Sequence, residues 1–580
     1  MTTQHTPTDP HAGDRSSTGR RTFLIGAAGT AAAGALVALD PASPAATAAP
    51  GGSTGLRTPA PRPSDPVVTP EDSRYLDLMT GNNARFVAEP EYVRLISSAR
   101  DAEAAVRAAV RTGKKVSVRS GGHCFADFVC NPEVEVILDL STMTNVYYDE
   151  GMRAFAVEPG ARLLHVYEKL FKGWGVTIPG GICYGVGAGG HIAGGGYGLL
   201  SRSHGLVVDH LYAVEVVTVD ARGRVRTRVA TRDSRGALGD LWWAHTGGGG
   251  GNFGIVTKYW FRSPGAHGTD PAEQLVKAPS RVLVSALSFP WDEVDRPAFD
   301  RLMTNWNEWH ERYRGPGTPE SHLSSLFNLN HRAHGSLGMF TQIDADAPDA
   351  AGVLRRFIEK ITDGVAVTAA PMATPSGELA AMPEFFDTQE LSWMQATRTV
   401  ATNNPTINSP TSRGMHKSAY FKKGFTPQQL DVMWEQLRRP DFTNPDTMMV
   451  VFSFGGQVNA VSPDATANVQ RDSIFKICLQ TFWQDESDDE FYLGWERETF
   501  EAMFARTGGV PVPDDAVDGC YINYPDTDMA DPARNRSGVP WSTLYYKDNY
   551  PRLQRAKQEW DPRNFFTHSL GIELPETTSR

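Results

Sequence analysis

A glycine-dense segment at residues 179–198, PGGICYGVGAGGHIAGGGYG, constrains this chain more than any other feature. Glycine has no Cβ atom, so its backbone N–H groups can approach an anion or a flat ring closely. We therefore expect the segment to cradle a pyrophosphate, although the same glycines could form only a structural loop. It is neither the G-x-G-x-x-G dinucleotide fingerprint nor a G-x-x-x-x-G-K-[ST] phosphate loop.

The N-terminus has the pattern of an export signal. Arg20 and Arg21 precede a Phe-Leu pair and then an apolar run rich in alanine and glycine. Small residues at 46–48 fit a signal-peptidase site. Because twin arginines are typical of a Tat-type signal, which exports folded proteins, we expect residues 1–48 to be removed and the protein to be secreted.

A Sec signal or a membrane anchor is the alternative interpretation of the same N-terminal residues. The apolar run is shorter than the ~20 strongly apolar residues that a membrane span requires. No other segment has that character, so we expect no membrane span after signal removal. Residues 49–70 are rich in Pro, Gly, Ser and Thr and predict a disordered lead-in.

The length and charge of the chain indicate a large globular protein that does not bind nucleic acid. A chain of 580 residues is long enough for more than one hydrophobic core. Hydrophobic residues at 40% and charged residues at 21% are typical of a globular protein. The net charge of -11, with no dense basic stripe, argues against a nucleic-acid partner.

Helix and strand patterns alternate through the rest of the chain, which favours an α+β fold. Residues 71–264 contain the glycine clusters and a predicted helix, with Asp101 as its N-cap and Gly113 as its stop. Residues 265–515 have fewer glycine clusters and more capped helices, so we expect a second α+β domain there. Residues 516–580 return to aromatic, loop-rich sequence.

Two residues flanked by glycines are candidates for chemistry. His123 follows a Gly-Gly turn in VRSGGHCF, a position that suits chemistry better than packing, although a turn histidine with satisfied ring nitrogens is the alternative. Cys183 lies among glycines rather than bulky apolar residues, which favours a reactive or ligand-attached thiol. His123, Cys124 and Cys130 lack the paired spacing of a zinc site, so we expect no metal. With five cysteines, at least one has no intramolecular disulfide partner.

Five motifs together are far more specific than any one alone. In chain order they are VRSGGHCF, GGICYGVGAGGHIAGGGYG, GGGGGNFGIVT, CYINYPD and DPRNFF. They resemble the berberine-bridge-enzyme-like branch of the vanillyl-alcohol-oxidase (PCMH-type) flavoproteins, from about Asn82 to Gly571. The resemblance implies a two-domain α+β fold. Residues 71–264 and 516–580 would form the FAD-binding domain, and residues 265–515 an antiparallel-sheet substrate domain.

The same resemblance implies FAD bound through two covalent bonds. His123 matches the 8α-histidyl anchor of the family, and Cys183 matches the 6-S-cysteinyl anchor. With Cys183 assigned to the flavin, Cys124–Cys130 becomes a candidate disulfide and Cys478–Cys520 a weaker one. The other implied cofactor-binding residues are Arg119, Ser120, Gly121, Gly122, Val186, Gly187, Gly190, His191, Gly195, Gly196, Gly254, Ile255, Val256 and Asn564.

The resemblance also assigns the reacting groups. Tyr524 in INYPD matches the family's active-site tyrosine near flavin N5, and we expect it to act as the base. Tyr197 in GGGYG matches a second tyrosine that shares the proton. An unperturbed tyrosine has a pKa of ~10, so this role needs neighbours that stabilise the phenolate. Val186 matches a position where a small β-branched residue leaves room for O2, which implies an oxidase that releases hydrogen peroxide.

This chain departs from the family pattern at two places. Many relatives have a polar residue just before a Gly-Gly pair on the substrate-domain sheet, whereas this chain has Phe452 and Phe454 in VVFSFGG. The lysine that assists the tyrosine in plant relatives is not found in CLQTFWQD, and Lys417 is a candidate replacement. We therefore expect the tyrosines to carry the base chemistry.

We expect an exported FAD-linked oxidase that acts on a small molecule such as an alcohol, a sugar lactol or a polyketide or glycoside hydroxyl, with O2 as acceptor. An oxidative cyclase or desaturase using the same flavin is the alternative, and a non-catalytic ligand-binding exoprotein is a remote one. Four aromatic residues near the C-terminus could stack on a substrate ring or only pack between domains. They are Trp541, Tyr545, Tyr546 and Tyr550.

Overall fold

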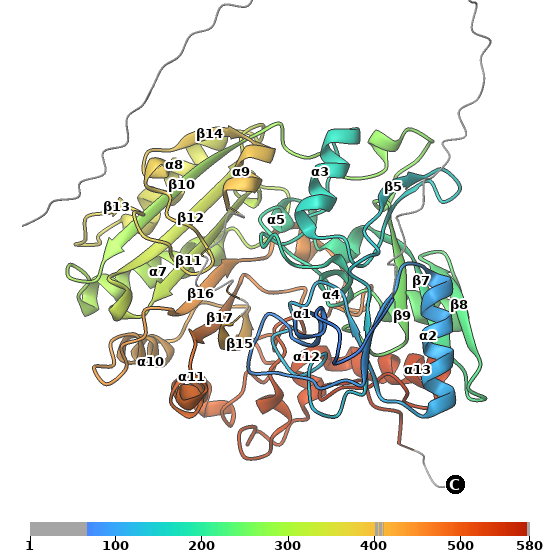
Figure 1. Cartoon of the computed structure of the whole chain (residues 1–580). Helices are drawn as coiled ribbons and strands as arrows, with labels where there is room; N and C mark the ends of the chain where they lie inside the picture. Colours follow the sequence, from blue (N-terminus) through green and yellow to red (C-terminus); the bar gives the residue numbers. More distant parts are fainter. Residues whose placement is uncertain (1–65, 401–403, 405–408, 410, 577–580) are drawn as a thin grey trace, which may run out of the picture. The chain divides into compact units, whose positions relative to one another are not determined.

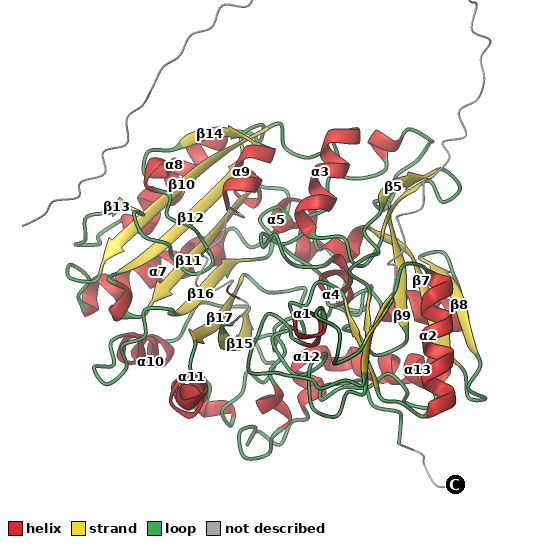
Figure 2. Ribbon diagram, in the orientation of Figure 1, coloured by secondary structure: helices red, strands yellow, loops and turns green. Residues whose placement is uncertain are grey.

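The computed structural model describes residues 66–400, 404, 409 and 411–576 (Figure 1). The predicted signal at 1–48 and most of the predicted lead-in lie outside the described residues. The described residues form two smaller sheets, one large sheet and the helices around them (Figure 2). No helix within them is both long and apolar enough to cross a membrane. Helices and sheets combine in the two-domain α+β arrangement that the motifs imply.

The first small sheet has four strands and contains the only parallel pairs of the three sheets in the described part of the chain. Helix α2 (Ala99–Thr112) connects β2 to β3 and buries an alanine- and valine-rich stripe against the sheet. It begins at Ser98, whose side chain accepts from the Asp101 N–H, so the prediction of Asp101 as N-cap was wrong. Gly113 ends the helix at φ 67° as predicted. In sheet order the strands are β1 (Val67–Val68), β2 (Tyr92–Leu95), β4 (Val136–Asp139) and β3 (Val116–Arg119).

The second small sheet is antiparallel and has five strands. The glycine-dense segment lies between its strands β6 and β7 in the chain, with helix α3 (Leu163–Trp174) before it and the short helix α4 (Ala188–Ala193) inside it. In sheet order the strands are β5 (Val146–Asp149), β6 (Ala154–Val157), β9 (Ile255–Phe261), β7 (Leu211–Val219) and β8 (Val225–Thr231).

The large sheet has eight strands and is antiparallel throughout. Alternate residues of each strand face opposite sides. Phe327 of β11 contacts Trp306 of helix α7 (Arg296–Arg312), so this side is covered by helices. The strands are β10 (Arg281–Pro290), β11 (Leu323–Asn330), β12 (Ser336–Asp344), β13 (Ala370–Pro371), β14 (Gln389–Ser392), β15 (Arg413–Phe421), β16 (Thr447–Ser453) and β17 (Phe475–Trp483).

The covering helices of the large sheet are amphipathic. Helix α8 (Ala350–Thr362) contacts β10 and β12, and helix α11 (Asp489–Met503) contacts β15 and β17 (Figure 1). Helix α10 (Pro427–Leu437) contacts α11 and begins at a capping box between Thr426 and Gln429. The opposite side of the sheet therefore remains for the cavity described below.

The C-terminal segment returns to the smaller sheets. Helices α12 (Trp541–Tyr546) and α13 (Tyr550–Trp560) carry the aromatic residues that were candidates for a stacking platform. These rings contact one another and are mostly buried, and none of them lines the cavity. Packing within the fold is therefore their role, and the stacking-platform interpretation was wrong.

Candidate active site

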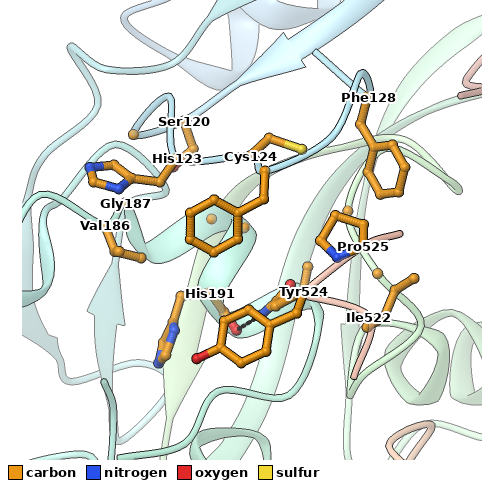
Figure 3. A pocket seen from close by; sticks show the side chains of 18 of the residues that line it. Ser120, His123, Cys124, Phe128, Val186, Gly187, His191, Ile522, Tyr524 and Pro525 are labelled. Atoms are coloured by element: carbon orange, nitrogen blue, oxygen red, sulfur yellow. Dashed lines mark hydrogen bonds between the residues drawn. The ribbon is translucent and has the colours of Figure 1, made fainter. Parts of the chain in front are cut away.

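A deep cavity lies between the glycine loops and the open side of the large sheet. It holds about 2230 Å³ of empty space, including the part that opens to solvent. In Figure 3, His123 and Val186 lie together along one edge and the Tyr524 ring lies across from them. The sequence-predicted site residues that line it are Ser120, Gly121, Gly122, His123, Cys183, Val186, Gly187, Gly190, His191, Tyr197, Gly254, Val256 and Tyr524.

Five sequence-predicted cofactor residues do not line the cavity. Arg119 instead turns to a buried carboxylate, with its Nε 3.4 Å from an oxygen of Asp139 on β4. Gly195 and Gly196 have φ of 119° and 70° and bend the chain behind the wall. Ile255 is fully buried in a core cluster, and Asn564 has a φ of 51° in a turn after α13. Their contribution is to the loop backbone rather than to the cavity surface.

Glycine is required where two loops that line the cavity come into backbone-to-backbone contact. A Cβ atom on Gly121 would overlap the backbone nitrogen of Gly187, and a Cβ on Gly187 would overlap Ser120 Oγ. Gly185 approaches the His123 ring so closely that a Cβ there would overlap Nε2. The glycines thus bring the His123 loop, which follows β3, onto the segment that carries Cys183.

The two predicted flavin anchors face one cavity. Burial, with the positive charges of Arg162 and Arg119, lowers the pKa of His123 to about 4, so its imidazole is neutral at pH 7. The loop before Cys183 is held at Gly181, whose N–H donates to His191 Nε2 at 3.1 Å. Burial lowers the pKa of His191 to about 4, which keeps that nitrogen an acceptor.

Two tyrosines from distant segments share a hydrogen bond at the cavity. The hydroxyl oxygens of Tyr524 and Tyr197 are 2.5 Å apart. Burial raises the pKa of both well above its usual value. A phenolate here therefore needs a nearby positive charge.

A candidate for that charge is a lysine that sequence reasoning missed. Lys476 on β17 lies with its Nζ 3.0 Å from the centroid of the Tyr197 ring and 4.5 Å from that of Tyr524. Its Nζ is buried and has no hydrogen-bond partner among the described residues. Burial lowers the pKa of Lys476 well below its usual value. Sequence reasoning missed Lys476 because it considered only CLQTFWQD, which begins two residues after this lysine.

Lys417, the predicted replacement cation, serves a different purpose. Its Nζ donates to Asp526 at 2.6 Å and to Asp528 at 2.8 Å, and all three side chains are buried. The charges of the two aspartates outweigh burial and raise the pKa of Lys417. Its charge is therefore neutralised, and the lysine anchors the segment that carries Tyr524.

The floor of the cavity is the open side of the large sheet. Phe452 lines it and packs edge-on against the Tyr197 ring, whereas Ser453 points to the other side and bonds His310. A carboxylate base from β16 is thus absent from the described strand, as predicted. Polar side chains come instead from Glu378 and Gln480, neither of which the sequence had indicated.

The two candidate disulfides do not form. Cys124, Cys130, Cys478 and Cys520 are all free thiols. Burial raises the pKa of Cys124 to about 12 and that of Cys130 to about 11. Cys478 lines the cavity from β17 while Cys520 lies in the hydrophobic core, so these two side chains have different surroundings. Both disulfide interpretations were wrong.

Two known protein families match parts of this chain that line the cavity. A family described as FAD binding domain matches residues 90–227, and one described as berberine and berberine like matches residues 520–573. The aclacinomycin-N/aclacinomycin-A oxidase of Streptomyces galilaeus is 44% identical over 562 residues, covering 96% of this chain and 98% of that protein. This chain belongs to the berberine-bridge-enzyme-like family of FAD-linked oxidases.

Further relatives agree with this assignment. The hexose oxidase of Chondrus crispus is 34% identical to this FAD-linked oxidase over 530 residues, covering 86% of this chain and 93% of that protein. A crystal structure of a glycopeptide hexose oxidase complexed with teicoplanin superposes with a TM-score of 0.81 at 45% identity. It covers 87% of this chain and 98% of that one. The prediction of an FAD-linked oxidoreductase with this two-domain fold is confirmed.

The cavity of this FAD-linked oxidase fits its cofactor. The consecutive N–H groups of residues 120–123 have no acceptor among the described residues, so they can donate to an anionic group. A Cβ atom on Gly190 would meet no atom within 4 Å, so the backbone there borders open space. A neutral imidazole and a thiol face the same space. These features suit a flat ring system with a pyrophosphate.

Proposed function

We propose that this oxidase converts a hydroxyl of a sugar or glycoside to a carbonyl and passes the electrons to O2, which gives hydrogen peroxide. One observation carries the proposal: the 2.5 Å contact between the Tyr524 and Tyr197 hydroxyls lies in the same cavity as His123 and Cys183. The relatives support the substrate class, because their names specify aclacinomycin, hexose and a glycopeptide hexose.

Tyr524 is the proposed base. As a phenolate it would take the proton of the substrate hydroxyl and become a neutral phenol. Before that step Tyr197 stabilises the phenolate by donating a hydrogen bond. Burial raises the pKa of Tyr524 and so disfavours formation of its phenolate. The hydrogen bond from Tyr197 lowers that pKa and partly offsets the effect of burial. Burial lowers the pKa of Lys476 itself, and in its protonated form Lys476 favours the phenolate, because a cation near the ring faces lowers the energy of the phenolate.

His123 and Cys183 would hold FAD covalently. FAD held there would supply the hydride acceptor for the substrate carbon, with O2 as the final oxidant. A neutral imidazole is the nucleophilic form of His123, and its lowered pKa supports that role. Val186, which lines the cavity beside His123, is small enough to leave room for O2.

Export through a Tat-type signal is part of the same proposal. The twin arginines at 20–21 support it, and such export suits a protein that acquires its cofactor before it leaves the cytoplasm. A fusion of residues 1–60 to a reporter should be exported in a Tat-competent host. Replacement of Arg20 and Arg21 by lysine should abolish that export.

Covalent attachment gives the sharpest test of the flavin chemistry. The purified protein is denatured in acid, the pellet is inspected for yellow colour, and the intact chain is weighed. We expect one FAD to remain attached after both acid and SDS. His123→Ala and Cys183→Ala should each retain flavin through the other bond, and only the double variant should release it.

Two outcomes would contradict the proposal at different levels. Flavin that stays in the acid supernatant of the unchanged protein would remove the covalent assignments and leave an oxidase with a dissociable cofactor. If dithionite reduces the bound flavin but exposure to air then gives no hydrogen peroxide, the protein is not an oxidase.

A further inference from the structure

A two-residue turn projects Glu378 over the floor of the cavity. Ser376 and Leu379 exchange both backbone hydrogen bonds at 3.0 Å, so Gly377 and Glu378 form the tip of a tight hairpin. Gly377 has a φ of 56°, the conformation that such tips favour for glycine. Glu378 itself lines the cavity together with Leu379.

Buried asparagines hold this hairpin on the sheet. Asn328 Nδ2 donates to the Ser376 carbonyl at 2.7 Å, and Asn330 Nδ2 donates to Ser376 Oγ at 2.9 Å. Asn404 secures the tip itself, since its side chain donates to the Gly377 carbonyl and its N–H donates to the Glu378 carbonyl. Four polar contacts from three asparagines therefore hold the hairpin tip that carries the Glu378 carboxylate.

Gln480 on β17 supplies a second acceptor beside Glu378. Its side chain is 3% exposed, lines the cavity and leaves Oε1 without a hydrogen-bond partner among the described residues. The Glu378 carboxylate is in no ion pair with the residues that the structure describes. A buried acceptor without a donor costs free energy unless a ligand supplies one. The floor thus offers two acceptor oxygens that a substrate can satisfy.

The surroundings favour neutral hydroxyl donors over a cation. Burial raises the pKa of Glu378, while the Gln480 side chain and the charge of Lys476 oppose that rise. In its protonated form Lys476 would repel a substrate ammonium group close by. Apolar side chains of Leu326, Val450 and Phe452 line the cavity around the two acceptors and suit the C–H face of a sugar ring.

We propose that Glu378 and Gln480 form a hydroxyl-recognition site for a pyranose ring, whose neighbouring hydroxyls donate to the Glu378 carboxylate and to Gln480 Oε1. The inference rests on the proposed oxidase function and names its substrate as a free sugar or a glycoside with ring hydroxyls intact. Glu378 is a specificity residue on this account, and proton removal remains with Tyr524.

The test compares holoenzyme variants on sugars and on a simple alcohol. Glu378→Gln, Glu378→Ala and Gln480→Met are matched with Glu384→Gln, which changes an exposed carboxylate six residues further along the same connection. The probes are D-glucose, D-galactose, cellobiose, the monodeoxyglucoses and benzyl alcohol. Binding is followed by perturbation of the flavin absorption spectrum, and turnover by hydrogen peroxide release.

For the sugars, Glu378→Ala should raise both the dissociation constant and KM by about 10- to 100-fold, as expected for loss of hydrogen bonds to a charged acceptor. The kcat should change less than about threefold, because the lost hydrogen bonds stabilise the bound substrate and the transition state equally. Benzyl alcohol and the Glu384→Gln control should show no such change. At least one monodeoxyglucose should bind wild type and Glu378→Ala alike, because it lacks the hydroxyl that Glu378 contacts.

Equal sugar affinity in wild type and Glu378→Ala would overturn the proposal, as would wild-type protein that binds none of the sugars. Dithionite reduction and reoxidation in air separate this failure from failure of the oxidase function. If hydrogen peroxide still forms in every variant, only the recognition site is wrong. If hydrogen peroxide forms in no variant and not in the wild type, both the oxidase function and the recognition site are wrong.

Discussion

The Nζ of Lys476 lies 3.0 Å from the centroid of the Tyr197 ring, which in turn shares its hydroxyl hydrogen bond with Tyr524. The lysine comes from β17 of the large sheet, whereas the tyrosines come from the glycine-dense segment and the C-terminal segment. The two domains therefore build the proposed proton-accepting group jointly. A cation at this place lowers the free energy of a phenolate in a site where burial raises it.

Replacement of Lys476 by methionine should weaken the base. Loss of the positive charge raises the pKa of the tyrosine pair further, so activity that needs a phenolate should require higher pH. We expect the rising limb of the kcat/KM profile to move up by about one pH unit or more, with a ~10- to 100-fold loss at neutral pH. Lys423→Met, which removes an exposed lysine paired with Asp515, should leave the profile unchanged. An unshifted profile for Lys476→Met would show that this charge does not act on the tyrosines.

Tyr524→Phe should remove the base and little else. Positioned acid–base groups contribute roughly 10²- to 10⁴-fold, so we expect kcat to fall by that factor. Covalent flavin content and the air oxidation of dithionite-reduced enzyme should match wild type, because neither step uses the phenol. Tyr212→Phe, on a half-buried tyrosine of β7, serves as the control. A variant that keeps wild-type kcat would assign the proton transfer to another group.

The sequence was informative where a local pattern decides the structure. The glycines at 121 and 187 predicted close backbone approach, and the structure confirms it, since a Cβ on either residue would overlap a neighbouring atom. The apolar runs at 280–289, 447–454 and 473–483 coincide with β10, β16 and β17. The order of the motifs predicted that His123, Cys183 and Tyr524 share one site, and all three line the cavity.

What the sequence could not supply depends on long-range packing. The side of β17 that carries Lys476 and Gln480 follows from its register with β15 and β16, which a single strand does not reveal. Glu378 reaches the cavity on a hairpin that Asn328 helps to fix through Ser376, which lies 48 residues further along the chain. The helix start at Ser98 rather than Asp101 is a local error, since both residues are common at N-caps.

Gly187→Ala should disturb the cofactor loops. The new Cβ would overlap Ser120 Oγ and the nitrogen of Gly121, so the two loops must separate. We expect an unfolding free energy lower by about 1–3 kcal/mol, as in other overpacked sites, and a reduced flavin-to-protein ratio. Gly173→Ala is the matched control, because its Cβ would meet nothing within 4 Å near the end of α3. That change should be neutral or stabilise by up to about 1 kcal/mol. Full flavin content in Gly187→Ala would contradict the backbone-contact argument.

Glu496 on α11 should make the protein less stable as the pH rises. Both carboxyl oxygens are buried without a hydrogen-bond partner among the described residues. Burial raises the pKa of Glu496 to about 8, although the charge of Lys417 opposes it. An unfolded glutamate has a pKa of ~4.3, so between ~4.3 and about 8 the unfolded chain ionises while the folded one stays protonated. The contribution of Glu496 to the free energy of unfolding is fully present below pH ~4.3. It is lost as the pH rises towards the pKa of about 8 in the folded protein.

Glu496→Gln removes that titration while keeping the shape of the side chain. At ~1.4 kcal/mol per pH unit, the advantage of the variant should grow from near zero at pH 4.5 to several kcal/mol at pH 8 and then level off. Urea-unfolding midpoints measured at half-unit steps of pH would follow it. Glu490→Gln, on an exposed residue of the same helix, should shift the midpoint little at any pH. A stability difference for Glu496→Gln that does not depend on pH would mean that Glu496 already ionises at its ordinary pKa, and that the charges of Lys417 and its neighbours outweigh burial.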